Sequence, residues 1–166
     1  EVGDTLHRRQ AGAAFEPVAR FDRSLIKLVP TEWGPPTFEI DGVKMLPTQQ
    51  VSPVDDARRK VALVEPRGKE VLDTCAGLGY FARSCLVGGA AQVTSFEVNP
   101  DVLWLRGLNP WSPPDGPGLR LVAGDVALAN LGSKDIGELA RSSSAAVTST
   151  RFRFDLTASR SLRALS

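Results

Sequence analysis

The sequence has few of the residues that build disulfide frameworks and metal sites. Its 166 residues include two cysteines, Cys75 and Cys85, and one histidine, His7. Two cysteines are too few for a disulfide scaffold, and this usage favours a reducing compartment. One histidine and two cysteines at this spacing cannot supply the four ligands of a structural zinc site. We therefore expect neither a disulfide framework nor a metal site.

The sequence also lacks an excess of either charge, and it has no long apolar run. Twenty lysines and arginines stand against nineteen acids, a formal net charge of +1. No overall field therefore recruits nucleic acid or an acidic membrane surface. No apolar run is long enough to span a bilayer, and the first ten residues lack the apolar stretch of a signal peptide. We expect a cytoplasmic protein with no membrane partner.

The residues that are present suffice for one globular domain with a small appendage. Hydrophobic residues make up 42% of the chain, enough to bury a core. Residues 1 to 51 contain a strand candidate at Ser24–Val29 and a hairpin, in which Asp41-Gly42 separates Thr37–Ile40 from Val43–Leu46. Asp-Gly favours the two-residue turn that matches strand twist. We expect an N-terminal β appendage here.

Strands and helices alternate over residues 52 to 141. Ser52-Pro53 predicts a helix start, because serine caps free amides and proline suits the first helical position. Arg58-Arg59-Lys60 is expected to be the solvated face of this helix. The alternation predicts a parallel sheet with right-handed crossovers. Strands are expected over Glu70–Thr74, Gln92–Val98 and Leu119–Ala123, and helices over Tyr80–Leu86, Asp101–Leu108 and Lys134–Arg141.

The strongest functional signal is the glycine turn that follows the first of these strands. The strand ends in Asp73, and Gly77 and Gly79 follow before the next helix begins. Glycine lets the backbone turn tightly and approach a ligand without a Cβ in the way. The small side chains of Cys75 and Ala76 keep the floor of such a pocket open. This pattern predicts a ligand site at the turn.

Acids also end the next two strands. Glu97, followed by Val98, is placed to bind ribose hydroxyls, as the acid of dinucleotide folds does. Asp125 closes the third strand, where it can accept a hydrogen bond from the amine of an adenine. Taken singly, such acids are more commonly solvated strand ends or helix caps. Three of them around one glycine turn predict a site for an adenosine-containing cofactor.

Two cofactors fit the turn. Gly77-Leu78-Gly79-Tyr80-Phe81-Ala82 matches the dinucleotide pattern G-x-G-x-x-A, which taken alone is a weak signal. Asp73 argues against a dinucleotide, because a carboxylate beside the turn repels a pyrophosphate. The same carboxylate can accept hydrogen bonds from the amino group of S-adenosyl-L-methionine. Electrostatics favours the methyl donor, and Trp111 in its proline-rich loop is a candidate to cover the pocket.

Several segments together carry a family resemblance. Val71–Tyr80, Phe96–Leu103, Leu108–Ser112, Leu28–Pro36 and Ile40–Val43 resemble a family of predicted methyltransferases, mostly archaeal, that is related in fold to the spermidine synthases. The resemblance covers about residues 25 to 125. It implies a Rossmann-like class I methyltransferase fold, incomplete at the C-terminus, that uses S-adenosylmethionine. In such a site Asp73, Gly77 and Gly79 would line the methionine end, Glu97 the ribose and Asp125 the adenine, while Cys75 stands where many methyltransferases have a first glycine.

The sequence departs from the family after Asp155. In similar proteins the fourth strand runs from a Phe-Asp dipeptide into an Asp-Pro-Pro motif beside the reacting methyl group. Here Phe154-Asp155-Leu156 is followed by Thr157-Ala158-Ser159-Arg160. We therefore expect residues 142 to 166 to be a Ser/Arg-rich tail, either a fourth strand or disordered. A fragment, a misread gene end and a degenerate copy are all consistent with this departure.

Three functions are consistent with these residues. The first is an S-adenosylmethionine-dependent methyltransferase that retains its cofactor-binding half. The second is a polyamine aminopropyltransferase-like enzyme, which would use a decarboxylated donor. The third is a non-catalytic adenosyl-binding or structural fragment. The sequence names no catalytic residue and no oligomeric state, and it leaves the methyl acceptor open among a small molecule, a protein and an RNA.

Overall fold

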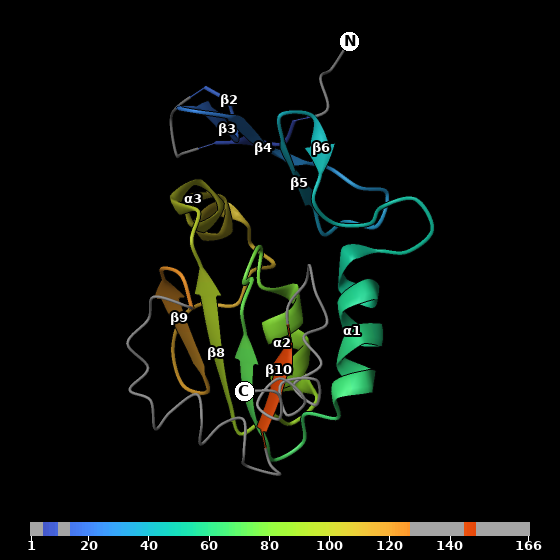
Figure 1. Cartoon of the computed structure of the whole chain (residues 1–166). Coiled ribbons are helices and arrows are strands. Elements are labelled where there is room, and N and C mark those ends of the chain that lie inside the picture. Colours follow the sequence, from blue (N-terminus) through green and yellow to red (C-terminus); the bar gives the residue numbers. More distant parts are fainter. Residues whose placement is uncertain (1–4, 10–13, 127–144, 149–166) are drawn as a thin grey trace, which may run out of the picture.

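The computed structural model describes residues 5–9, 14–126 and 145–148 of the chain. These residues form an antiparallel sheet in the order β3-β4-β5-β6, a parallel sheet in the order β10-β7-β8-β9, and a short pair, β1 and β2 (Figure 1). The antiparallel sheet lies at the end of the molecule toward which the strands of the parallel sheet point. The predicted α/β architecture with a small N-terminal β appendage is therefore present.

The antiparallel sheet confirms the predicted hairpin. Asp41 and Gly42 have φ angles of 50° and 80°, the left-handed pair that a two-residue turn requires. The strands β1, β2 and β3 were not predicted, because two or three residues are too short to show a periodic pattern. The elements are β1 (His7–Arg8), β2 (Glu16–Pro17), β3 (Ala19–Phe21), β4 (Leu25–Val29), β5 (Thr37–Ile40) and β6 (Val43–Lys44).

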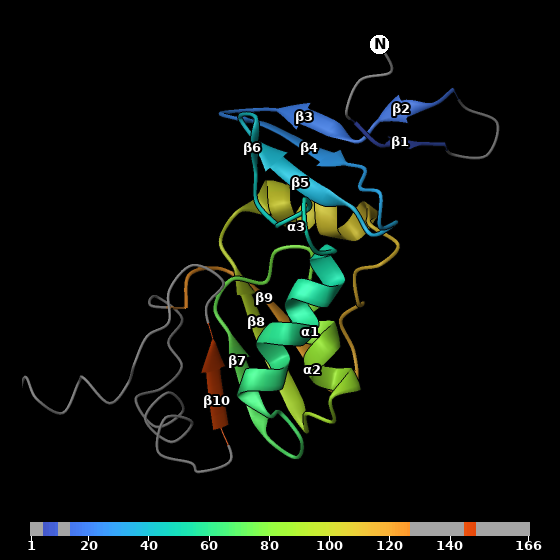
Figure 2. The same ribbon diagram turned by 90° about the vertical axis from the view of Figure 1, so that its right-hand side faces the viewer.

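The helix α1 (Pro53–Val64) begins as predicted. Ser52 Oγ accepts a hydrogen bond from the amide of Asp55 at 2.9 Å, which is the expected N-cap. The helix ends at Glu65, whose φ of 50° is left-handed. In Figure 2, α1 and α2 stand side by side along the parallel sheet.

The strands of the parallel sheet and the two helices between them agree with the predicted bounds to within one or two residues. The hydrophobic cluster between α1, α2 and the sheet contains Val61, Phe81 and Val93. Each of these residues comes from a different predicted element, so the cluster joins the two helices to the sheet. The elements are β7 (Glu70–Asp73), α2 (Tyr80–Val87), β8 (Gln92–Glu97), α3 (Pro100–Leu108) and β9 (Leu119–Ala123).

The structure adds a fourth parallel strand, β10 (Ala145–Thr148), beside β7. Counted along the chain, β7, β8, β9 and β10 are the first to fourth strands of this sheet. Across the sheet they lie in the order fourth, first, second, third, as the first four strands of the Rossmann order do. This strand lies within residues 142 to 166, for which a fourth strand was one of the two expectations. The strand predicted near Phe154 and the helix predicted over Lys134–Arg141 both lie outside the described residues.

The N-terminal sheet shares a hydrophobic core with the rest of the molecule. Ile26, Leu28 and Phe38 from this sheet pack with Tyr80 of α2 and Leu105 of α3. Figure 2 shows α3 between the two sheets. The appendage therefore covers the carboxyl edge of the parallel sheet instead of extending away from it.

No helix in the described ranges is long and apolar enough to cross a membrane. Neither Cys75 nor Cys85 forms a disulfide bond. The described residues contain no cluster of His, Cys, Asp and Glu suited to a metal ion.

Candidate functional site

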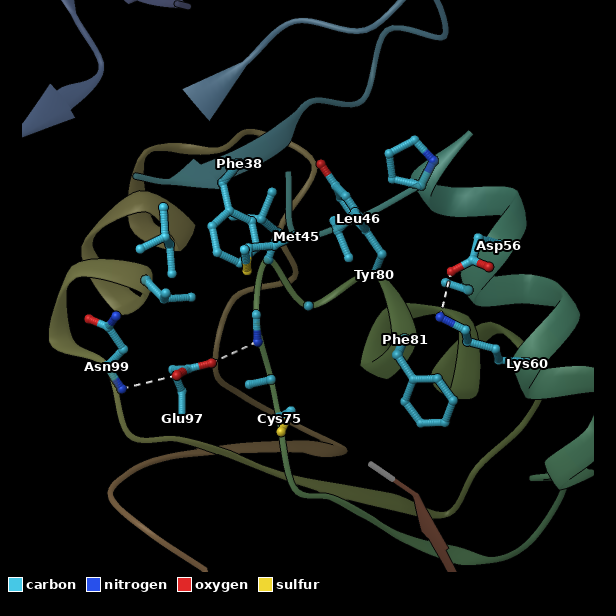
Figure 3. Close-up of a pocket in the computed structure, with 18 of the residues that line it drawn as sticks. Phe38, Met45, Leu46, Asp56, Lys60, Cys75, Tyr80, Phe81, Glu97 and Asn99 are labelled. Atoms are coloured by element: carbon cyan, nitrogen blue, oxygen red, sulfur yellow. Dashed lines mark hydrogen bonds and ion pairs between the residues drawn. The ribbon is translucent and has the colours of Figure 1, made fainter. Parts of the chain in front are cut away.

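A cavity of about 350 Å³ lies at the carboxyl edge of the parallel sheet, beneath the N-terminal sheet (Figure 3). The glycine turn, Cys75–Phe81, lines it from the side of β7, and Glu97–Asn99 lines it from the end of β8. Apolar side chains of the N-terminal sheet and the segment after it form its roof, and α1 forms one wall. The roof contains Phe38, Ile40, Met45 and Leu46, and the wall contains Pro53, Asp56, Ala57 and Lys60.

The glycine turn has the backbone geometry that only glycine adopts readily. Gly77 and Gly79 have φ angles of 50° and 83°. Gly79 also begins α2 as its N-cap residue. A Cβ at Gly79 would overlap the guanidinium of Arg106, whereas a Cβ at Gly77 would come no closer than 4.0 Å to Phe38. The two glycines are therefore required for different reasons.

The amides of the turn are used within the protein. The Ala76 amide donates to the carbonyl of Phe96 at 2.8 Å, and the Gly79 amide donates to the carbonyl of Ala76 at 2.8 Å. The Gly77 amide donates to Glu97 Oε2 at 3.0 Å. These hydrogen bonds join the turn to β8 and leave its backbone rigidly placed.

Glu97 lies in the cavity wall with both carboxylate oxygens fixed. Besides the Gly77 amide on Oε2, the Asn99 amide donates to Oε1 at 3.0 Å (Figure 3). Each carboxylate oxygen can accept more than one hydrogen bond. Glu97 can therefore hold the two loops and still accept from hydroxyl groups of a ligand. Its contact with a ribose remains a prediction.

Asp73 lies beneath the turn and is only 1% exposed. Ser95 Oγ donates to Asp73 Oδ2 at 3.0 Å, and the Cys75 amide donates to Oδ1 at 3.3 Å. Burial raises the pKa of Asp73 to about 6, and these two hydrogen bonds oppose the rise. Asp73 does not line the cavity, so a ligand there would meet only its electrostatic field and the turn that it shapes. Direct contact with an amino group remains a prediction.

The other predicted residues divide between the cavity and its surroundings. Cys75, Ala76, Gly77, Gly79 and Val98 line the cavity beside Glu97. Asp125 is exposed after β9 and does not line it. Trp111 is outside the lining too; its carbonyl accepts from Arg83. The structure thus gathers six of the eight predicted residues around one cavity.

Arg106, a buried cation beneath the turn, was not predicted from the sequence. Its side chain comes from α3 and is 4% exposed. It donates to the carbonyls of Ala76 and Pro113 at 3.5 and 3.4 Å. Burial lowers the pKa of Arg106, and the nearby carboxylates, first Asp73 and then Glu97, oppose this. Nothing in a helical arginine taken alone distinguishes it from a solvated one.

A hydrogen-bonded network around Tyr80 was missed as well. Its hydroxyl donates to the carbonyl of Pro36 at 2.8 Å and accepts from Asn109 Nδ2 at 3.1 Å. Asn109 also donates to Ser112, whose hydroxyl donates to the carbonyl of Leu78 at 2.8 Å. The network joins two segments that carry the family resemblance, Leu28–Pro36 and Leu108–Ser112, to the glycine turn. The presence of both segments in the family resemblance was the sequence signal that could have pointed to this network.

Lys60 corrects the prediction of a wholly solvated Arg58-Arg59-Lys60 face. Arg58 and Arg59 are exposed as expected. Lys60 instead lines the cavity and pairs with Asp56 at 2.6 Å. Which of three consecutive residues turns inward depends on how α1 packs, and the sequence does not show this.

The fold and the site define an α/β unit with a cavity at the carboxyl edge of a parallel sheet. No family model matches the chain. Over 102 residues the chain is 44% identical to an uncharacterized protein of Methanocaldococcus jannaschii, and the match covers 60% of this chain and 34% of that protein. The chain thus spans about one third of the length of this relative.

Two solved structures are similar in part. Spermidine synthase from Thermotoga maritima is 19% identical to this chain, with a TM-score of 0.49. The match covers 68% of this chain and 44% of the synthase. An S-adenosylmethionine-dependent methyltransferase from Mesorhizobium loti is 22% identical to this chain, with a TM-score of 0.35. The match covers 43% of this chain and 33% of the methyltransferase. At these scores the likeness is partial and carries no functional conclusion.

Proposed function

We propose that this chain binds S-adenosyl-L-methionine and is the cofactor-binding part of a methyltransferase. The observation that carries the proposal is the position of Glu97. It ends β8, the strand next to β7, and its carboxylate lies in the cavity wall against the glycine turn. An acid placed one strand from a glycine turn is where Rossmann-type sites bind ribose hydroxyls.

The electrostatics of the turn favours a cationic ligand over a pyrophosphate. A pyrophosphate needs free backbone amides at the turn. Here the amides of Ala76, Gly77 and Gly79 already donate to protein oxygens. The carboxylate of Asp73 lies beneath the turn and that of Glu97 lies beside it, and both would repel a phosphate. The sulfonium and ammonium groups of S-adenosylmethionine are attracted by the same carboxylates.

The size and the lining of the cavity agree with one nucleoside-sized cofactor. Small-molecule sites range from about 300 to 1,000 Å³, and about 350 Å³ lies at the small end. The roof residues Phe38, Met45 and Leu46 offer an apolar cover for a thioether chain or a base. A dinucleotide, with two nucleosides, needs a larger cavity.

Methyl transfer itself would use groups beyond this cavity. When the sulfonium methyl passes to a nucleophile, S-adenosylhomocysteine remains as product. The acceptor is a small molecule, a protein or an RNA, and the proposal assigns no catalytic residue. An aminopropyltransferase-like enzyme would use the same adenosine part of the site. Its donor would lack the α-carboxylate of S-adenosylmethionine.

Calorimetric titration of the full chain with S-adenosylhomocysteine tests the proposal. We expect binding in the micromolar range and a loss of affinity of at least about tenfold for Glu97→Ala, because hydrogen bonds to a charged group contribute about 1.5 to 3 kcal/mol each. Glu97→Gln, which keeps one acceptor oxygen, should lie in between.

Glu70→Ala is the matched control, because Glu70 is an exposed acid at the opposite end of β7. Its affinity should equal that of the wild type. Absence of heat from folded wild-type protein, or unchanged binding by folded Glu97→Ala, contradicts the proposal.

A further inference from the structure

The helix α1 contributes two opposite charges to the cavity wall. Lys60 Nζ lies 2.6 Å from Asp56 Oδ2, one helical turn away. Both side chains line the cavity, with 43% and 21% of their surfaces exposed. The neighbouring pair, Arg58 with Asp55, does not line it. The Lys60–Asp56 pair is therefore part of the site and not only of the helix surface.

The pair and Glu97 lie on opposite sides of the glycine turn. Figure 3 shows Glu97 with Asn99 on one side of the turn, and Asp56 with Lys60 on the other. A ligand whose ribose binds Glu97 can extend along the turn toward α1. Its far end would then reach the charged pair.

The chemistry of the pair matches an α-amino acid. A zwitterionic amino acid carries an ammonium group and a carboxylate on one carbon. Its carboxylate can accept hydrogen bonds from Lys60, and its ammonium can donate to Asp56. Such charge-assisted hydrogen bonds are the stronger kind. Because an isolated i, i+4 ion pair stabilises a helix only slightly, a ligand can separate the two charges at little cost to α1.

We propose that Asp56 and Lys60 bind the amino-acid end of the adenosyl ligand, so that the site selects a donor that retains its α-carboxylate. This inference rests on the proposed function and makes it more specific. A decarboxylated donor would leave Lys60 without its ligand partner. The pair therefore favours methyl transfer over aminopropyl transfer.

Wild-type protein alone provides the first test. In calorimetric competition on the full chain, S-adenosylmethionine should bind about tenfold or more tightly than its decarboxylated form, because one charge-assisted contact to Lys60 is lost. Equal affinity for the two donors overturns the inference.

Variants of α1 provide the second test, with S-adenosylhomocysteine and 5′-methylthioadenosine as the two probes. The latter has the adenosine and the thioether without the amino acid. Lys60→Met should lower affinity for S-adenosylhomocysteine about tenfold and leave methylthioadenosine binding unchanged. Lys60→Arg, which keeps the cation, should restore most of the loss. Arg59→Met is the matched control and should alter neither affinity.

The outcomes separate this inference from the proposed function. If the wild type binds neither probe, the adenosyl site itself is wrong. If it binds both, and Lys60→Met weakens both equally or neither, the adenosyl site stands and the role of Lys60 is wrong. Binding of methylthioadenosine by Lys60→Met also shows that the variant is folded.

Discussion

At the residue scale, Asp73 shows how one buried carboxylate shapes the site. Its side chain is fully enclosed, and burial is the main reason that its pKa rises from 3.8 to about 6. Hydrogen bonds from Ser95 and the Cys75 amide, together with the charge of Arg106, partly offset this cost. At neutral pH the group is therefore mostly ionised and provides negative charge beneath the turn.

The raised pKa of Asp73 predicts a pH dependence of stability. The folded state holds the Asp73 proton up to about pH 6, whereas the unfolded state loses it near the ordinary value of 3.8. Stability conferred by this group is therefore present below about pH 4 and is lost as pH rises to about 6. The loss is about 3 kcal/mol, at about 1.4 kcal/mol for each pKa unit.

Urea unfolding of wild type and Asp73→Asn at pH 4 and pH 7 measures this effect. Asparagine does not titrate, so the difference in unfolding free energy between the two proteins should move by about 2 kcal/mol in favour of the variant between these pH values, because the unfolded carboxyl is already partly ionised at pH 4. The pH-dependent contributions of the other carboxylates are the same in both proteins and cancel in the difference. A difference that stays constant with pH would show that Asp73 titrates normally.

At the element scale, the glycine turn and α3 depend on each other. Arg106 of α3 occupies the space beside Gly79 and donates to the carbonyl of Ala76. Asn109, at the end of α3, donates to Tyr80 at the start of α2. The shape of the turn is therefore set by α3 as much as by its own glycines.

The two glycines of the turn should respond differently to alanine. At Gly77 the cost is that of a left-handed φ, about 1 to 2 kcal/mol. At Gly79 the added Cβ must also displace the buried guanidinium of Arg106, so Gly79→Ala should cost at least about 1 kcal/mol more than Gly77→Ala. Urea unfolding of both variants measures the difference. Equal losses would mean that Arg106 moves aside freely.

At the scale of the whole molecule, the N-terminal sheet completes the site. It roofs the cavity through Phe38 and shares a core with α2 and α3, in which Leu28 and Leu105 are fully buried. A sheet that shares its core with the rest of the molecule should unfold together with it. The contact of the N-terminal sheet with α2 and α3 therefore supports both the roof of the cavity and the stability of the molecule.

Leu28→Ala tests this cooperation. Removing a buried leucine side chain should lower the unfolding free energy by about 2 to 5 kcal/mol. Far-UV circular dichroism and tryptophan fluorescence should still give one coincident urea transition. Leu25→Ala, at an exposed position of the same strand, is the control and should change stability by about 0.5 kcal/mol or less. Two separate transitions would show that the N-terminal sheet folds independently.

Local sequence signals predicted the elements well where backbone chemistry is specific. Ser52 caps α1 and Asp41-Gly42 turns the hairpin, each as its residue type implies. A fourth strand within residues 142 to 166 was one expectation, but the position of β10 (Ala145–Thr148) was not predicted, because its four residues have no distinctive periodicity and its place depends on pairing with β7.

The sequence by itself determined the alternation of strands and helices, the glycine turn and the acid at the end of β8, because these follow from periodicity, φ preferences and chain order. Only the tertiary structure decided that Lys60 faces the cavity, that Arg106 lies buried beneath the turn, and that Asp73 lies below the site. These depend on how helices pack and on which side chains lose contact with water, and no local pattern encodes either.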